Sequence, residues 1–140
     1  MPAGLLLAGI GFACGPGGSA ADESGLERAR VELGASFVGG GAGGLEPLLH
    51  EDLIVQPPEP DSAVRQEAAA SYIVRLARET RVGHSELVPT TIAREGDFLL
   101  EQGSWFLESA SRRYRSRYTI RWRPSPSGWQ VVLWRWTSFR

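Results

Sequence analysis

Two carboxylates and one phenol in this sequence are candidates for acid–base chemistry. Asp52 follows His50 by two positions, so the two side chains could together orient a water molecule. Glu101 could be a buried carboxylate, and burial favours the protonated form of such a group. With either acid as general base and Tyr118 as hydrogen-bond donor, the chain would suit an isomerase, a cyclase or a hydrolase.

Each of these acids also has a structural interpretation. His50 and Asp52 would form a cap or a surface turn, which is the commoner role of a polar pair at a helix-to-strand junction. Glu101 would form an ion pair across a sheet with Arg117 or Arg121, and we favour this pairing over a free base. Whether the protein is an enzyme is therefore left open.

Large aromatic side chains could line a pocket for a small hydrophobic molecule. Rings offer flat apolar surface, and one or two polar groups among them would orient the ligand. The residues expected to bind it are Tyr72, Trp105, Tyr118, Trp122, Trp134 and Trp136. The alternative, which we favour slightly, is a core filled by these rings, because a small domain needs their apolar area for stability.

The sequence predicts no metal and no cofactor. It has two histidines and one cysteine, and no glycine-rich loop with a lysine follows a strand. All fifteen basic residues are arginine, and eight of them follow Glu108, whereas the preceding part is acidic on balance. We expect the two halves to neutralise each other, and we expect no nucleic-acid partner. Arginines on a solvent-facing strand are an ordinary means of keeping a sheet soluble.

A sheet is needed to bring these side chains together, and the C-terminal sequence predicts one. Residues 114–138 have the pattern of a β-hairpin, with its turn at residues 124–128. On the first strand, Tyr118, Ile120 and Trp122 alternate with arginines, which predicts one buried and one exposed face. On the second strand, strict alternation predicts Trp129, Val131 and Leu133 on one face and Val132, Trp134 and Trp136 on the other.

The remaining sequence predicts helices first and strands afterwards. Helical patterns cover residues 22–38, residues 45–49 and a segment from an N-cap at Asp61 or Ser62 to about residue 80, with a short strand at 53–56. Strands are predicted at 84–94, 98–108, 112–123 and 129–139. This order predicts one α+β domain over residues 22–140, with about three helices on the concave face of a mostly antiparallel sheet.

Several local sequences in this order resemble a known family. The strand at residues 50–55, the stretch from Asp97 to Phe106 with Gly103 inside it, residues 117–123, residues 128–132 and the closing 136–138 resemble the nuclear transport factor 2-like superfamily. Within it, they are most similar to the SnoaL-like and ketosteroid-isomerase-like branch. The resemblance implies a cone-shaped curved sheet around a cavity, and a homodimer formed through the outer face of the sheet.

The resemblance also bears on catalysis. The general-base aspartate of ketosteroid isomerases would fall at Gln56 or Pro57, and neither side chain can abstract a proton. The polar residue of many SnoaL-like enzymes on the last strand would fall at Leu133 or Trp134. The expected function is therefore a module that binds a small hydrophobic ligand or dimerises without catalysis, with the enzyme as the alternative.

The first 21 residues are interpreted as a leader and linker. An uncharged apolar run ends at Ala13 and is too short to span a bilayer, and Cys14 follows it directly. This pattern resembles a bacterial lipoprotein signal. We therefore expect an exported protein that is lipidated at Cys14 and attached to the membrane through that lipid alone, or else a periplasmic or extracellular protein. A disordered cytosolic tail is the remaining alternative.

Overall fold

A computed structural model of the protein describes residues 20–40 and 44–140. The chain forms α1 (Ala20–Ala35), a short 3-10 helix (Glu46–Leu48), β1 (Leu49–Gln56), β2 (Val64–Arg65), α2 (Gln66–Thr80), β3 (His84–Glu95), β4 (Phe98–Glu108), β5 (Arg113–Ser125) and β6 (Gly128–Trp136). Of the predicted leader, Cys14 and all residues before Ala20 lie outside the described residues.

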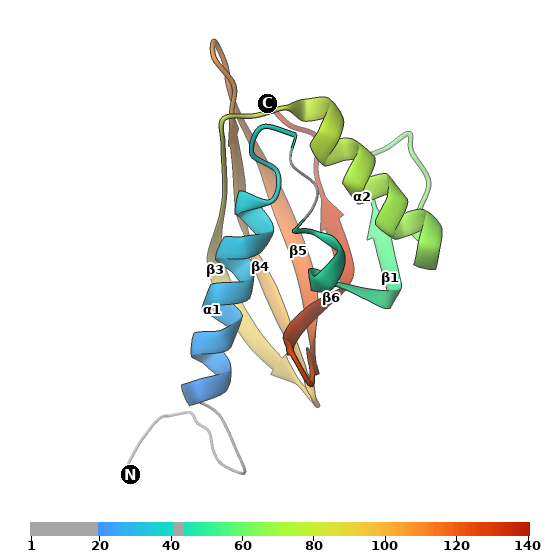
Figure 1. The fold of residues 1–140 in the computed structure, drawn as a ribbon, viewed down its shortest axis with the longest axis vertical. Helices are drawn as coiled ribbons and strands as arrows, with labels where there is room; N and C mark the ends of the chain where they lie inside the picture. Colours follow the sequence, from blue (N-terminus) through green and yellow to red (C-terminus); the bar gives the residue numbers. More distant parts are fainter. Residues whose placement is uncertain (1–19, 41–43) are drawn as a thin grey trace.

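The strands form one curved, open sheet in the order β2-β1-β6-β5-β4-β3 (Figure 1). Neighbouring strands are antiparallel, except that β1 runs parallel to β6. The predicted α+β class with a mostly antiparallel sheet is confirmed. The β4–β5 hairpin projects beyond the rest of the sheet at the top of Figure 1.

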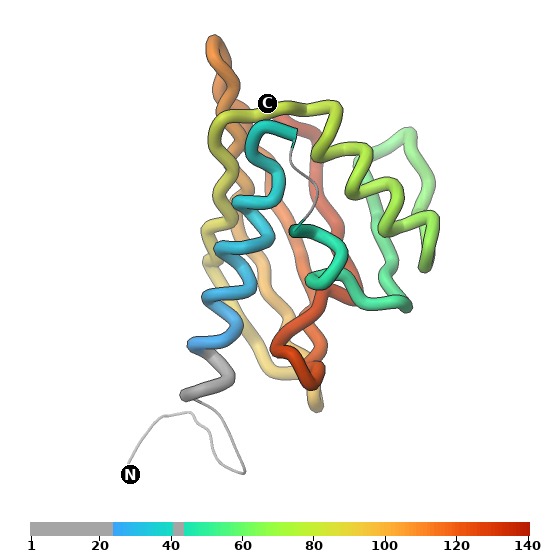
Figure 2. The backbone as a smooth tube through the Cα atoms, in the orientation of Figure 1, coloured from blue at the N-terminus to red at the C-terminus, as the bar shows by residue number. Residues whose placement is uncertain are grey.

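Helices α1 and α2 lie on the same face of the sheet, which we call the inner face (Figure 2). Leu26, Ala29 and Leu33 recur at helical spacing on α1 and are buried, so one side of this helix packs on the sheet. The prediction of about three helices is wrong, since the described residues contain two α-helices. Between them, Pro47 lies in a single 3-10 turn, because the chain must extend into β1 at Leu49.

The third predicted helix begins three or four residues later than expected. Val64 and Arg65 form β2, which pairs with Val55 and Ile54 of β1. Pairing with β1 satisfies backbone N–H and C=O groups that would otherwise be left open at the edge of the sheet. The tertiary contact therefore overrides the capping potential of Asp61 and Ser62, and α2 starts at Gln66.

The two faces predicted for the last strand from strict alternation are also wrong, because β6 contains a bulge. Arg121 pairs with Leu133, whereas the next residue, Trp122, pairs with Val131. Val132 is therefore an extra residue, which reverses the phase of the alternation. As a result, the buried residues Trp129, Val131, Trp134 and Trp136 all lie on the inner face.

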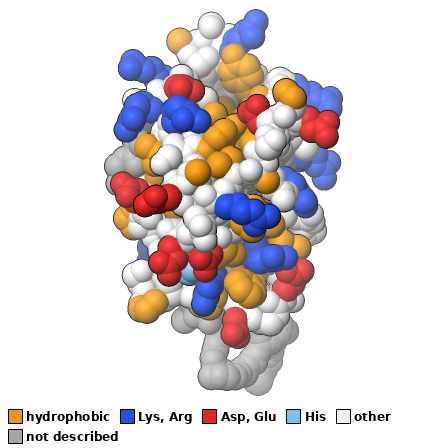
Figure 3. All heavy atoms as spheres, turned by 90° about the vertical axis from the view of Figure 1, so that its right-hand side faces the viewer, with side chains coloured by type: hydrophobic (Ala, Val, Ile, Leu, Met, Phe, Trp, Pro, Cys, Tyr) orange, Lys and Arg blue, Asp and Glu red, His pale blue; other side chains and the backbone are white. Residues whose placement is uncertain are grey.

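The surface carries charges of both signs. The side of the molecule seen in Figure 3 shows acidic and basic side chains interspersed, with hydrophobic ones between them. Acidic and basic side chains are therefore mixed on this side of the molecule. Within residues 20–40 and 44–140, no helix has the length and apolar character needed to cross a membrane.

Close approach of β3 to β4 leads to a first prediction. A Cβ atom on Gly103 would lie 2.1 Å from the carbonyl oxygen of Val88 and 2.7 Å from Cα of Pro89. We expect Gly103→Ala to lower the free energy of unfolding by about 3 kcal/mol, because these backbone atoms must move. Chemical denaturation measures this change.

Gly25→Ala in α1 is the matched control. Its Cβ would meet Trp129 at an ordinary 3.6 Å, so it should stabilise the protein by about 0.5–1 kcal/mol through helix propensity. Equal effects of the two substitutions would contradict the predicted clash.

Candidate functional site

A cluster of aromatic rings fills the inner face of the sheet. Trp105 on β4 is fully buried, and its indole N–H donates to the hydroxyl of Ser85 at 3.2 Å. Its ring centroid lies 5.1 Å from that of Phe37, 5.1 Å from Trp134 and 5.2 Å from Phe139. These are edge-on and tilted contacts of the kind that dense aromatic cores adopt. The rings therefore present their faces and edges to one another.

The other residues expected to bind a hydrophobic ligand belong to the same core or border it. Trp122, Trp134 and Tyr118 are buried, and Trp136 packs against Trp105 with its centroid at 5.8 Å. Tyr72 on α2 is half-buried, lies 6.3 Å from the ring of Trp136 and donates its hydroxyl to Asp61. The structure thus brings the six residues to the inner face, and their role in ligand binding stays a prediction.

Glu101 is the polar centre of this apolar face. Its side chain is fully buried, and four hydrogen-bond donors from three side chains converge on the carboxylate. Arg30 of α1 donates from Nε to Oε2 and from Nη2 to Oε1, both at 2.9 Å. Tyr118 donates its hydroxyl to Oε2, and Trp122 donates its indole N–H to Oε1 at 3.2 Å. The two oxygens are therefore saturated by a forked ion pair and two neutral donors.

This cluster shifts the pKa values of its two other titratable members. Burial raises the pKa of Tyr118 far above its usual value, and the neighbouring Glu101 carboxylate raises it further. Burial acts to lower the pKa of Arg30, but the hydrogen bonds and charge of Glu101 outweigh it, so the pKa is raised. Both groups therefore keep their protons throughout the physiological range.

The ion pair predicted for Glu101 was assigned to the wrong arginines. Arg117 and Arg121 lie on the opposite face of β5, where Arg121 pairs with Glu95 at 3.3 Å. Arg30 was missed, although its spacing from Leu26 and Leu33 places it on the buried side of α1. An arginine on an apolar helix face was the sequence signal for a buried carboxylate partner.

These contacts decide what the candidate acids can do. A carboxylate that already accepts four hydrogen bonds has no lone pair directed at a substrate proton, so Glu101 is built as a structural anion. Asp52 lies on β1 with its side chain 65% exposed, and β6 and β5 separate β1 from the strand that carries Glu101. Its backbone N–H donates to Nδ1 of His50, which is the local turn contact that the sequence allowed. The proposed base and donor are thus not assembled around Asp52.

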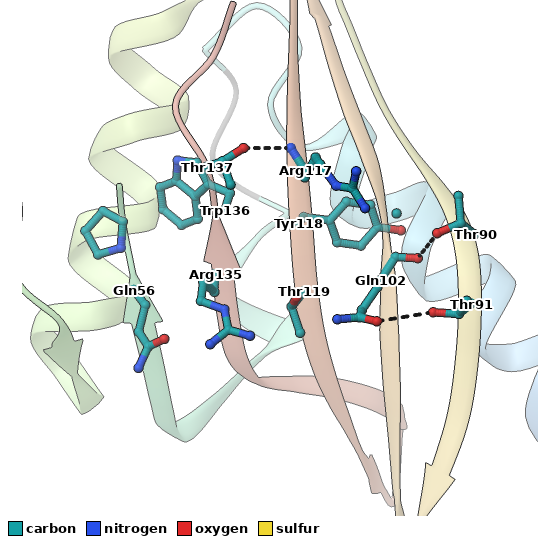
Figure 4. A pocket seen from close by; sticks show the side chains of 12 residues that line it. Gln56, Thr90, Thr91, Gln102, Arg117, Tyr118, Thr119, Arg135, Trp136 and Thr137 are labelled. Carbon is teal, nitrogen blue, oxygen red and sulfur yellow. Dashed lines mark hydrogen bonds between the residues drawn. The ribbon is translucent and has the colours of Figure 1, made fainter. Parts of the chain in front are cut away.

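A groove of about 510 Å³ lies on the other side of the sheet, which we call the outer face (Figure 4). Five of its residues form one row across five strands, each paired in register with the next. In sheet order these are Gln56, Arg135, Thr119, Gln102 and Thr91. The groove is completed by Pro57, Thr90, Gly103, Arg117, Tyr118, Trp136 and Thr137. No sequence prediction included this polar row, because it depends on the register of non-local strands.

Within the part of the chain that the structure describes, no group of three or more His, Cys, Asp or Glu side chains comes together. The groove offers hydroxyl, amide and guanidinium groups instead. Its chemistry is therefore that of a hydrogen-bonding site.

Comparisons with known proteins identify the fold. The sequence matches no family model and no curated protein. Among solved structures, an NTF2-like protein of unknown function from Pseudomonas putida is 15% identical, with a TM-score of 0.68 over 86% of this chain and 88% of that chain. A protein from Parabacteroides distasonis, named for a proposed ketosteroid isomerase activity, is 13% identical, with a TM-score of 0.59 over 82% and 83% of the two chains.

A third similar structure is named as a proposed association domain of a calcium/calmodulin-dependent protein kinase type II, from Thiobacillus denitrificans. It is 16% identical, with a TM-score of 0.69 over 81% of this chain and 94% of that chain. At these identities the comparisons bear on the fold alone. The chain therefore has the nuclear transport factor 2-like fold, as its sequence resemblance predicted.

The saturated carboxylate leads to a second prediction. Glu101→Gln should lower the free energy of unfolding by about 3–5 kcal/mol, because it leaves Arg30 charged and buried without a counter-ion. Chemical denaturation followed by tryptophan fluorescence measures the change.

Glu95→Gln is the matched control for this substitution. It removes the half-exposed pair with Arg121 and should cost less than about 1 kcal/mol. If Glu101→Gln were as mild as Glu95→Gln, the structural role of the buried carboxylate would be refuted.

Proposed function

We propose that this domain of the nuclear transport factor 2-like fold is a non-catalytic binding module that works through the outer face of its sheet. The proposal rests on one observation, which is that the inner and outer faces of the sheet differ in what they present. The inner face holds packed rings and a saturated carboxylate, whereas the groove lies on the outer face. Hydrogen-bonding groups that a partner can reach are thus on the outer face.

Two features argue against the alternative functions. A general base on the inner face would require Glu101 to give up its contacts with Arg30 and Tyr118. A small hydrophobic ligand on that face would require fully buried rings such as Trp105 and Trp134 to separate, at the cost of their mutual packing. Binding at the outer face requires neither rearrangement.

We also propose that the module forms a homodimer through this outer face. Val88 on β3 is 37% exposed and Phe106 on β4 is 36% exposed. The strand register makes them diagonal neighbours, since Val88 pairs with Ser104 and Phe106 with Glu86. Half-exposed Phe98 and Leu100 follow on the same face of β4. Apolar side chains on a sheet face favour a second copy as the partner that covers them.

The homodimer leads to a third prediction. Phe106→Glu should shift the domain from dimer to monomer, because two copies would bury a charge at their contact. Sedimentation velocity over a dilution series of residues 20–140 measures the change in mass.

Val31→Glu is the control for this experiment. Val31 is 63% exposed on α1, away from the outer face, so its replacement should leave the dimer intact. A wild-type domain that sediments as a monomer at all concentrations would contradict the proposed dimer.

We further propose that the mature protein is exported and anchored by lipid at Cys14. The support is the sequence pattern, in which an apolar run ends directly before the cysteine and is followed by small residues. The lipid would hold the domain at a membrane surface and leave the outer face of the sheet accessible to partners.

The anchor leads to a fourth prediction. When the full chain is expressed in a bacterium, Cys14→Ser should move the protein from the membrane fraction to the soluble fraction and abolish the incorporation of labelled fatty acid. Cell fractionation and metabolic labelling measure both effects. Ser19→Ala, a change behind the cysteine, should alter neither. Labelling that persists in Cys14→Ser would exclude this lipidation site.

A further inference from the structure

We propose that the outer groove binds a small organic oxyanion, a carboxylate or a phosphate monoester, between Arg117 and Arg135. The inference rests on the proposed function only in assuming that the outer face is the binding face. It does not require the homodimer. The ligand class follows from the charge of the groove, from its oriented hydrogen-bond donors and from its volume.

The groove carries an uncompensated positive charge. Its lining includes two arginines and no aspartate or glutamate. Within the described residues, neither Arg117 nor Arg135 forms an ion pair, whereas Arg113 and Arg121 of the same sheet pair with Glu108 and Glu95. The nearest acid by strand position, Glu101, points to the inner face and is neutralised by Arg30. Two guanidinium groups that share a groove without a counter-ion attract an anion.

The positions of the two arginines suit one bound group. Arg135 pairs in register with Thr119, and Arg117 lies two residues away on the same face of the adjacent strand. Such diagonal neighbours are about 7–8 Å apart at their Cα atoms, so their long side chains can converge on one oxyanion. Guanidinium groups donate in a planar fork that matches carboxylate and phosphate oxygens, which makes these the favoured ligands.

Neutral groups in the groove are oriented as further donors. The side-chain Oε1 of Gln102 accepts a hydrogen bond from the hydroxyl of Thr91 at 3.4 Å, so the amide of Gln102 directs its NH₂ group away from β3 and along the row (Figure 4). Thr119, which is 91% buried, lies next in the row, between Gln102 and Arg135. An oxyanion held by the arginines would thus find amide and hydroxyl donors beside it.

The size of the groove bears on the kind of anion. Pro57, which follows β1, and Trp136, at the end of β6, belong to its lining, and both are buried. A groove of this size leaves room for the carbon skeleton of an organic anion, which a free inorganic ion lacks. A volume of about 510 Å³ is in the range of small-molecule sites. The geometry therefore fits an organic molecule with one anionic group better than it fits a bare ion.

Isothermal titration calorimetry of residues 20–140 at low ionic strength tests this site with three probes: phenyl phosphate, benzoate and inorganic phosphate. We expect saturable binding of phenyl phosphate or benzoate, tighter than that of inorganic phosphate, and weakened by added salt. The preferred organic probe identifies the anionic group as phosphate or carboxylate. Absence of saturable binding by both organic probes, or equal binding of inorganic phosphate, would overturn the proposal.

Substitutions locate the binding. Arg135→Gln and Arg117→Gln should each raise the dissociation constant about tenfold or more, because each removes a charge-assisted pair. Arg123→Gln is the matched control, since Arg123 is exposed on the same face of β5 but lies outside the groove. Thermal midpoints within a few degrees of wild type confirm that the variants are folded. A loss of binding in Arg123→Gln equal to that in Arg135→Gln would show diffuse attraction and refute the site.

The same titration on Phe106→Glu separates this inference from the homodimer. Phe106 is not part of the groove lining, so its replacement should leave the affinity for the organic probe within about twofold of wild type. A monomeric wild-type domain that still binds the probe would refute the dimer and support the anion site. A wild-type dimer that binds none of the probes would support the homodimer and refute the anion site.

Discussion

The buried carboxylate of Glu101 is the constraint on which the rest of the structure depends. Removing a charge from water is costly, and the cost is offset only where well-placed donors replace the solvent. Here the donors come from α1, through Arg30, and from β5, through Tyr118 and Trp122. A change in the position of α1 or in the register of β5 would leave the Glu101 carboxylate buried without these donors. The cluster therefore fixes the position of α1 over the sheet and determines which faces of β4 and β5 point inward.

Around this cluster, irregularities in β6 and β3 determine which side chains lie on the inner face of the sheet and which lie on the outer face. The extra residue in β6, Val132, brings Trp134 and Trp136 to the same face as Trp129. A second irregularity in β3, at Thr90, allows the strand to approach Gly103 closely. The bulge in β6 brings large rings to the inner face, and the irregularity in β3 places Thr91 opposite Gln102 in the polar row of the outer face. Bulges that re-aim side chains in this way are features of curved sheets.

The sequence predicted the strands well because alternation and turn residues are local signals. Phe98–Glu108 was predicted to the residue. Errors arose where distant contacts decide the outcome. The start of α2 depends on pairing of Val64 with Val55, and the partner of Glu101 depends on where α1 docks. The polar row depends on the register of five strands, which local sequence does not encode.

The filled inner face agrees with the lack of a general base at the positions where the resemblance would place one. In the resemblance to ketosteroid isomerases, the base would fall at Gln56 or Pro57, and here both of these residues line the outer groove instead. A domain without an acceptor in its cavity gains nothing from keeping the cavity open, whereas burial of each large ring contributes about 1.5–3 kcal/mol. The packing of Trp105, Trp134 and Phe37 against one another therefore fills space that a ligand could occupy, and burial of the rings stabilises the fold. In the function proposed for this domain, recognition is carried by the outer face of the sheet, where the groove with its two arginines supplies the donors.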